Sequence, residues 1–127
     1  MGAHSDRKGK VGERELAKFL REHGYPSARR GQQHAGGGDS PDVVCDELPG
    51  LHLECKRTER FRLYEAVAQA QRDAPKQRVP VVAHRMNRRE WVAVVPLADF
   101  LLLYGYAKIG HQELLGEPME GDDELST

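Results

Sequence analysis

The sequence predicts an α/β fold in which a mixed central sheet is flanked by helices. The main observation is the order of its segments. A stretch with helical periodicity comes first, and two short strands, a second helical stretch, two further strands and a third helical stretch follow. The length of 127 residues suits one domain with one core. A composition of 39% hydrophobic and 31% charged residues is ordinary for a globular protein.

A first helix is expected from about Lys10 to His23, because Gly24 is a typical residue just beyond a helix end. Glu13 falls on the same face as the apolar stripe of this helix, which consists of Leu16, Ala17 and Leu20. A carboxylate on an apolar stripe is costly unless a positive group meets it. Glu13 is therefore a candidate functional residue, with a simple ion pair to a nearby arginine as the alternative.

A β-hairpin is expected next, after a short strand or extended link at Tyr25–Arg30 and a Gly-rich loop over residues 31–40. Asp42–Cys45 and Leu51–Lys56 form its strands. Alternation places two sets of side chains on opposite faces. The apolar set is Val43, Cys45, Leu51, Leu53 and Cys55, and the opposite set is Asp42, His52, Glu54 and Lys56.

The second half continues with a basic connector, Arg57–Arg62, and a helix from about Leu63 to Ala74 that ends before Pro75. Two further strands are expected at Val79–His84 and Glu90–Val95. A short apolar helix, Leu97–Tyr104, follows Pro96. We expect its apolar stripe to lie in the core, with a dimer interface as the alternative.

Charge is distributed unevenly along the chain. Residues 1–110 carry all 19 Lys and Arg residues against 14 acidic ones, a net charge of +5, whereas residues 111–127 carry six acidic residues and no basic one. We therefore expect one folded domain over residues 1–110 and an acidic, disordered tail over residues 111–127. A basic surface attracts polyanions such as nucleic acids, although this signal alone is weak.

The sequence offers no sign of a membrane or secretory location. No apolar run approaches the roughly 20 residues that cross a bilayer, and no apolar segment follows the charged N-terminus. The two cysteines, Cys45 and Cys55, suit small buried side chains with reduced thiols. We expect a cytoplasmic protein (in the host cytoplasm if a phage encodes it) that has no membrane partner.

The residues opposite the apolar hairpin face are suited to phosphodiester hydrolysis. Asp42 and Glu54 can hold a hard divalent cation, and Lys56 can contact the attacking water or the phosphate. Glu13 supplies a third carboxylate. An all-oxygen donor set favours Mg²⁺, with Mn²⁺ able to substitute. The alternative is a solvated outer face of a hairpin.

A zinc site would need histidines or cysteines at short, regular spacings. His34, His52 and His84 show no such spacing. We expect them to be surface or loop residues.

The string Pro41-Asp42, followed after eleven residues by Glu54-Cys55-Lys56, resembles the PD-(D/E)xK nuclease superfamily. Further motifs, in the same order and at similar spacings over roughly residues 8–95, resemble archaeal-type (Hjc-like) Holliday-junction resolvases. They are Lys8-Gly9, Gly12–Leu16, His23–Tyr25, Arg29, Pro41–Val44, Leu53–Lys56, Leu63-Tyr64, Val79–Ala83 and Trp91. A phage and bacterial branch of PD-(D/E)xK endonucleases shares Gly31–Gln33, Lys56–Arg60 and the cluster that begins at Gln69.

The resemblance implies a restriction-endonuclease-like fold and a homodimer that cuts branched, four-way DNA. It implies metal ligation by Asp42, Glu54 and the backbone carbonyl of Cys55, with Glu13 as a further acid. It also implies that Lys56 and Gln69 act at the site. The DNA-binding residues would be Lys8, Arg14, Arg29, Arg30, Gln32 and Gln33. Arg57 and Arg60 directly follow the strand that carries Glu54 and Lys56, so they are further candidates for DNA contact, with a solvated surface as the alternative. Archaeal members carry a serine in the loop after the first strand, where this chain reads Arg30-Gly31-Gln32-Gln33.

The expected function is a metal-dependent, structure-selective DNA endonuclease, a Holliday-junction resolvase that makes paired symmetric nicks. Two alternatives stay open. One is a restriction-like or nicking endonuclease of the same superfamily that acts on another DNA substrate. The other is a non-cleaving DNA-binding protein of nuclease ancestry, which the competent residue types at all four chemical positions disfavour.

Overall fold

The structure, a computed structural model, describes residues 2–31 and 41–116, without the side chains of residues 2–8, 114 and 115. The chain divides into two compact units, Met1–Val95 and Pro96–Thr127, which we describe separately. Several expectations concern parts outside this description: Gln32, Gln33, His34 and the rest of the Gly-rich loop after Gly31, the side chain of Lys8, and the tail from residue 117.

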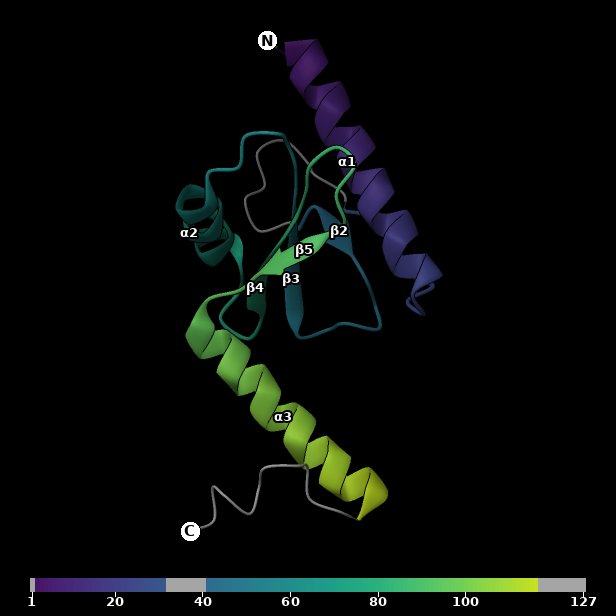
Figure 1. Ribbon diagram of the computed structural model, residues 1–127, viewed down its shortest axis with the longest axis vertical. Coiled ribbons are helices and arrows are strands. Elements are labelled where there is room, and N and C mark those ends of the chain that lie inside the picture. Colours follow the sequence, from purple (N-terminus) through teal and green to yellow (C-terminus); the bar gives the residue numbers. More distant parts are fainter. Residues whose placement is uncertain (1, 32–40, 117–127) are drawn as a thin grey trace. The chain divides into compact units, whose positions relative to one another are not determined.

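The first unit contains a five-stranded mixed sheet, which confirms the predicted α/β class (Figure 1). Its strands are β1 (Arg29–Arg30), β2 (Val43–Val44), β3 (Leu51–Arg57), β4 (Val79–Arg85) and β5 (Val92–Val94). They lie in chain order across the sheet. The central strands β3 and β4 are parallel, in register from Leu51 opposite Val79 to Arg57 opposite Arg85, and all other pairs are antiparallel.

Helix α1 (Gly2–Glu22) covers one face of the sheet. Leu16 and Ala17 are buried against Val43, Leu53 and other apolar side chains of β2 to β4. The helix begins well before the predicted start at Lys10. It ends where expected, because Gly24 adopts a positive φ of 96°, which favours glycine.

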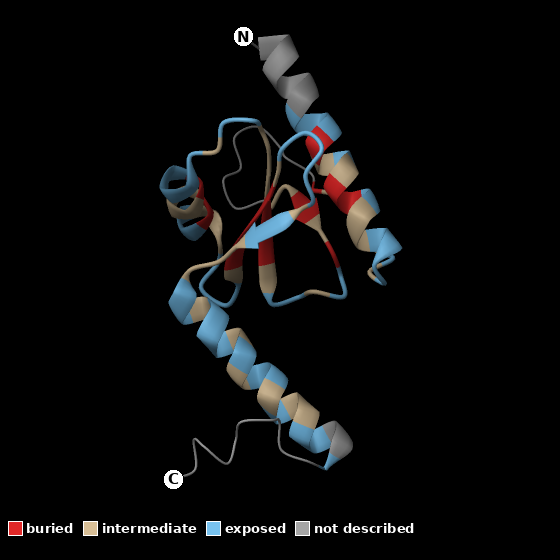
Figure 2. Cartoon of the chain, viewed as in Figure 1, coloured by how far each residue is buried: buried red, intermediate tan, exposed pale blue. Residues whose placement is uncertain are grey.

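Helix α2 (Leu63–Asp73) covers the opposite face. Ala66 and Ala70 pack there against Val82 of β4, and Figure 2 shows buried residues on the inner sides of both helices and along the central strands. The predicted alternation of the hairpin is confirmed. Val43 and Leu53 lie in the core under α1, whereas Glu54 is opposite Val82 in register and so faces the α2 side.

Helix α3 (Leu97–Leu115) belongs to the second unit and is much longer than the predicted Leu97–Tyr104. Gly105 and Gly110 are accommodated inside the helix, and Gly116 ends it with a positive φ of 68°. Within the second unit, no other described residues cover the apolar stripe of α3. Its large apolar side chains are exposed (Figure 2): Leu97, Phe100, Leu101, Leu102, Tyr104, Tyr106 and Ile109.

None of the helices in the described residues has both the length and the apolar character needed to cross a membrane. Both described cysteines are free thiols, as expected. Burial raises the pKa of the Cys55 thiol to about 12, and the nearby acids Asp42, Glu13 and Glu15 act in the same direction. A thiol with so high a pKa is a poor nucleophile, which fits its role as a packing residue.

Candidate active site

Asp42 is held at the start of β2 by three backbone contacts to neighbouring segments. Its N–H donates to the carbonyl of Leu53 at 3.0 Å, and its carbonyl accepts from the N–H of Gly31 at 2.9 Å. Its side-chain Oδ2 accepts from the N–H of Cys55 at 2.8 Å. The carboxyl group is therefore anchored directly to β3, the strand that carries Glu54 and Lys56.

Gly31 allows this arrangement because it closely approaches Pro41. A Cβ atom at position 31 would collide with the backbone oxygen of Pro41, so no side chain can be accommodated there without a backbone shift. Since Pro41 immediately precedes Asp42, the glycine at position 31 supports the position of the acid itself.

Glu54 lies on β3 and is buried, with 5% of its surface exposed. Its Oε1 is 2.9 Å from Nε2 of His52, two residues earlier on the same strand. Period-two alternation accounts for the contact, because both side chains point to the α2 side of the sheet. A buried carboxylate needs such a partner, since burial without one would be very costly.

Asp42 and Glu54 are close enough to perturb each other. Burial is the largest cause that raises the pKa of Asp42 from 3.8 to about 7, and a hydrogen bond and charge repulsion from Glu54 add to it. The N–H of Cys55 and the positive charge of Lys56 oppose the shift only in part. Two acids that repel each other in a buried site would be relieved by a cation placed between them.

Lys56 continues the same strand face and points to α2. Its Nζ donates to Oε1 of Gln69 at 3.2 Å. Both side chains line a pocket of about 330 Å³, whose other walls come from the β3–α2 connector and α2: Thr58, Arg60, Phe61, Arg62, Glu65 and Ala66. The structure thus brings Lys56 and Gln69 together in a pocket whose lining residues are mainly polar or charged.

Glu13 reaches the same region from α1, but its carboxylate already has a partner. Oε1 of Glu13 accepts from Nε of Arg30 at 3.0 Å, and the Glu13 side chain is 12% exposed. Burial is the main cause that raises its pKa. The charge of Asp42 acts in the same direction, and Arg30 opposes both. The ion pair that the sequence left as an alternative for Glu13 is present.

The donor set fits a hard divalent cation. Asp42, Glu54 and the carbonyl of Cys55 offer only oxygen, the ligand type that Mg²⁺ prefers. Over residues 9–31 and 41–113, no three His, Cys, Asp or Glu side chains form a ready-made metal cluster. An ion at this site would therefore use the two carboxylates and complete its coordination with water and substrate oxygens, as Mg²⁺ commonly does.

Several predicted DNA-binding arginines are engaged within the protein. Arg29 donates to the Ser27 carbonyl at 2.8 Å and pairs with Asp46 at 3.2 Å. Arg57 pairs with Glu15 on α1 at 3.1 Å and with Glu59 at 3.4 Å. Arg14 and Arg60 are exposed.

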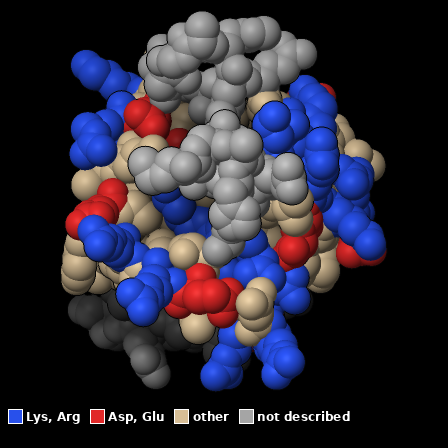
Figure 3. All heavy atoms as spheres, turned by 90° about the horizontal axis from the view of Figure 1, so that it is seen from above, with Lys and Arg blue, Asp and Glu red and all other residues tan. Residues whose placement is uncertain are grey.

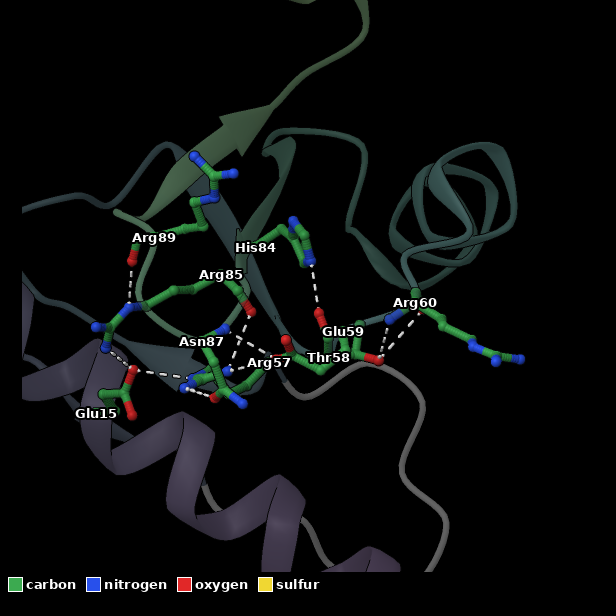
Figure 4. A network of polar contacts seen from close by, with 9 residues as sticks. All are labelled: Glu15, Arg57, Thr58, Glu59, Arg60, His84, Arg85, Asn87 and Arg89. Atoms are coloured by element: carbon green, nitrogen blue, oxygen red, sulfur yellow. Dashed lines mark hydrogen bonds and ion pairs between the residues drawn. The ribbon is translucent and has the colours of Figure 1, made fainter.

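The contacts of Arg57 belong to a larger network that the sequence did not predict (Figure 4). Glu15 accepts from both Arg57 and Arg85, which lie at the ends of the paired strands β3 and β4. Glu59 accepts from the N–H of Asn87 at 2.9 Å, and Asn87 accepts from Arg57 at 2.7 Å. The network ties α1, the β3–α2 connector and the β4–β5 loop together.

Lys and Arg side chains spread over the face of the molecule shown in Figure 3, with smaller acidic groups between them. This distribution agrees with the basic charge expected for the folded part of the chain. A surface of this sign is suited to the phosphate backbone of a nucleic acid.

Two histidines differ from the expectation of surface positions. His52 and His84 are buried, with 0% and 7% of their surfaces exposed. His84 donates from Nε2 to the Thr58 carbonyl at 3.0 Å and stacks on Phe61. The signal that could have identified His52 is its place two residues before Glu54, on the strand face that carries the acids.

Comparison with known proteins agrees with this geometry. No curated protein and no solved structure shows significant similarity to the chain. The family profile described as archaeal Holliday junction resolvase (Hjc) matches residues 4–100, a span that includes every one of the site residues described above. The chain therefore belongs to the archaeal Holliday junction resolvase family of nucleases, which act on branched DNA.

Proposed function

We propose that this chain is a Mg²⁺-dependent endonuclease that resolves four-way DNA junctions by paired, symmetric nicks, working as a homodimer. The observation that carries the proposal is the acid pair of half-buried Asp42 and buried Glu54, with Lys56 two residues beyond Glu54 on the same strand. The pKa of Asp42, raised to about 7 by burial and by Glu54, supports the proposal, because a cation would offset the repulsion between the two acids.

In this proposal Asp42, Glu54 and the Cys55 carbonyl hold the metal ion. The bound ion would neutralise charge that grows on the phosphate and lower the pKa of a water molecule. Lys56, steadied by Gln69, orients the attacking water or contacts the phosphate. Glu13 acts near the metal ligands and is not one of the main ligands, because Arg30 already holds its carboxylate.

DNA contacts are proposed to divide into two kinds. Arg14 and Arg60 are exposed and can reach phosphates directly. Arg29, Arg30 and Arg57 are held by acidic partners, so we propose that they mainly order the site and the β3–α2 connector. Lys8, Gln32 and Gln33 remain proposed DNA contacts on the strength of the sequence.

The proposed dimer uses α3. Two nicks at symmetric positions require two active sites at a fixed separation, which a two-fold dimer supplies through one self-complementary patch. The exposed apolar side chains of α3 support this choice. Single apolar residues scattered over a surface are normal, whereas seven large exposed ones on one helix indicate an interaction surface. The second candidate is the surface around Trp91–Val95, where Val92 of the edge strand β5 is 48% exposed.

Light scattering tests the assembly. We expect a species of about 29 kDa, twice the chain mass of 14.3 kDa. Replacing Leu101 and Leu103 with glutamate should give a folded monomer if α3 is the interface. An unchanged dimer mass would exclude α3 and transfer the test to Val92.

The activity is tested with a synthetic four-way junction beside a linear duplex of the same sequence. We expect junction cleavage with Mg²⁺ or Mn²⁺ but not with Ca²⁺ or EDTA. Asp42→Asn and Glu54→Gln should abolish cleavage yet keep or strengthen junction binding, because each removes a negative charge that faces phosphates. Lys56→Ala should reduce the rate by about two orders of magnitude or more.

Three results would count against this proposal. Full activity in excess EDTA would exclude the metal site. Cleavage at the wild-type rate by either acid variant would exclude that acid as a ligand. Equal cleavage of junction and duplex would favour a nuclease with another DNA substrate.

A further inference from the structure

We propose that His52 is a positioning residue for the metal site, which fixes the orientation of Glu54 through a buried hydrogen bond. The inference rests on the proposed function, in which Glu54 is a metal ligand. The two side chains are among the most buried polar groups in the described residues, at 0% and 5% exposure, and their closest atoms are 2.9 Å apart.

The contact assigns a direction to the hydrogen bond. A carboxylate can only accept, so Nε2 of His52 carries the proton and donates it to Oε1 of Glu54. The other ring nitrogen, Nδ1, is buried and has no hydrogen-bond partner among the described residues.

An unpartnered buried polar atom is unfavourable, and an apolar side chain of similar size would avoid that cost. Packing therefore does not explain a histidine at position 52. The feature that an apolar residue could not supply is the N–H group aimed at Glu54.

With this hydrogen bond, both acids are anchored in the same way, each through one carboxylate oxygen. Asp42 is anchored through Oδ2 by the N–H of Cys55, and Glu54 is anchored through Oε1 by His52. A carboxylate held by one oxygen is restricted in rotation, so its other oxygen is presented in a defined direction. Outer partners that orient metal ligands typically contribute about 10- to 100-fold in metal affinity.

His84 provides a matched comparison on the neighbouring strand. It is also buried and also donates from Nε2, but its acceptor is the backbone carbonyl of Thr58 rather than a carboxylate of the site. Loss of either histidine should reduce stability. Only loss of His52 should alter metal binding.

The test measures Mn²⁺ affinity of the full-length protein by calorimetry without DNA, beside its melting temperature in EDTA. His52→Gln keeps an N–H donor near the position of Nε2, whereas His52→Asn, one methylene shorter, does not reach Glu54, and His52→Leu has no donor. We expect the Leu and Asn variants to bind Mn²⁺ about 10- to 100-fold more weakly. The Gln variant should stay within about threefold of wild type, as should His84→Leu despite a lower melting temperature.

The Mn²⁺ concentration that gives half-maximal single-turnover junction cleavage should be higher for His52→Leu and His52→Asn than for wild type, His52→Gln and His84→Leu. Wild-type affinity in both His52→Leu and His52→Asn, with only the melting temperature lowered, would overturn the inference and leave His52 a structural residue. If His52→Leu does not fold, the comparison of His52→Gln with His52→Asn tests the inference. Equal Mn²⁺ affinities of these two variants would overturn the inference. Failure of the proposed function looks different, because the wild-type protein itself would then bind no Mn²⁺, and the inference would fall with the metal site.

Discussion

Asp42→Asn should change how the stability of the metal-free protein depends on pH. Burial and Glu54 raise the pKa of Asp42 from 3.8 to about 7. Asparagine preserves the polar contacts of the protonated acid, because its oxygen can accept from the N–H of Cys55 and its amide can donate to Glu54. The variant therefore imitates protonated Asp42 at every pH.

The magnitude follows from the shift. A carboxyl group whose pKa is higher in the folded than in the unfolded state favours folding most when it is protonated. Its contribution is therefore greatest below about pH 4, is lost as the pH rises to about 7 and is constant above that. The loss is at most about 1.4 kcal/mol per pH unit, and up to about 4 kcal/mol over the window.

The assay is urea unfolding of both proteins in EDTA at pH 5, 6, 7 and 8. We expect the free energy of unfolding of Asp42→Asn to exceed that of wild type by a margin that grows up to pH 7 and then levels off. Titrating groups that Asp42 does not perturb are present in both proteins and cancel in the difference. Glu13 does not cancel, because the charge of Asp42 raises its pKa, and it adds to the margin in the same direction. Asp46→Asn, which alters an exposed aspartate, should show a constant margin.

Mg²⁺ provides the complementary measurement. At pH 8 it should stabilise wild type and leave Asp42→Asn unchanged, because the variant lacks one of the two carboxylates that hold the ion. A margin independent of pH would refute the reasoning that Asp42 and Glu54 form a strained pair.

Three further predictions concern the support of the site and the tail. Gly31→Ala should lower the free energy of unfolding by about 1–3 kcal/mol and weaken Mn²⁺ binding, because its Cβ would collide with the Pro41 backbone oxygen. Urea unfolding and calorimetry measure the two effects. Gly50→Ala, whose Cβ would meet open space, should change neither. Glu15→Gln should reduce the free energy of unfolding by about 1 kcal/mol, since it removes the charged acceptor that Arg57 and Arg85 share. Glu65→Gln, in a pair more than 70% exposed, should have no measurable effect. Deletion of residues 117–127 should leave the melting temperature unchanged and tighten DNA binding, because it removes negative charge; a large fall in melting temperature would contradict this.

Much of the first unit could be predicted because its signals are local. Period-two alternation placed Val43 and Leu53 in the core and Glu54 on the other face, as the structure has them. Gly24 marked the end of α1, and Pro75 the end of α2. These residues act through backbone geometry, which depends little on distant parts of the chain.

The features that could not be predicted depend on contacts across long stretches of sequence. Glu15 meets Arg57 and Arg85, which are 42 and 70 residues away, and no spacing rule links them. The burial of His52 depends on tertiary packing, which alternation along a strand does not reveal. Helix α3 extends beyond the predicted Leu97–Tyr104 because it continues through Gly105, a residue type that disfavours a helix interior.

The central claim is that one complex makes two coordinated nicks in a branched DNA. A supercoiled plasmid that extrudes a single cruciform tests it directly, because two nicks within one binding event give a linear product and separate nicks give a nicked circle first. With Mg²⁺ and wild-type protein, we expect the linear product to form without accumulation of the nicked circle. A mixture with excess Glu54→Gln subunits should shift the product to nicked circles. Nicked circles that accumulate before any linear DNA in the wild-type reaction would contradict the claim and indicate a nicking nuclease.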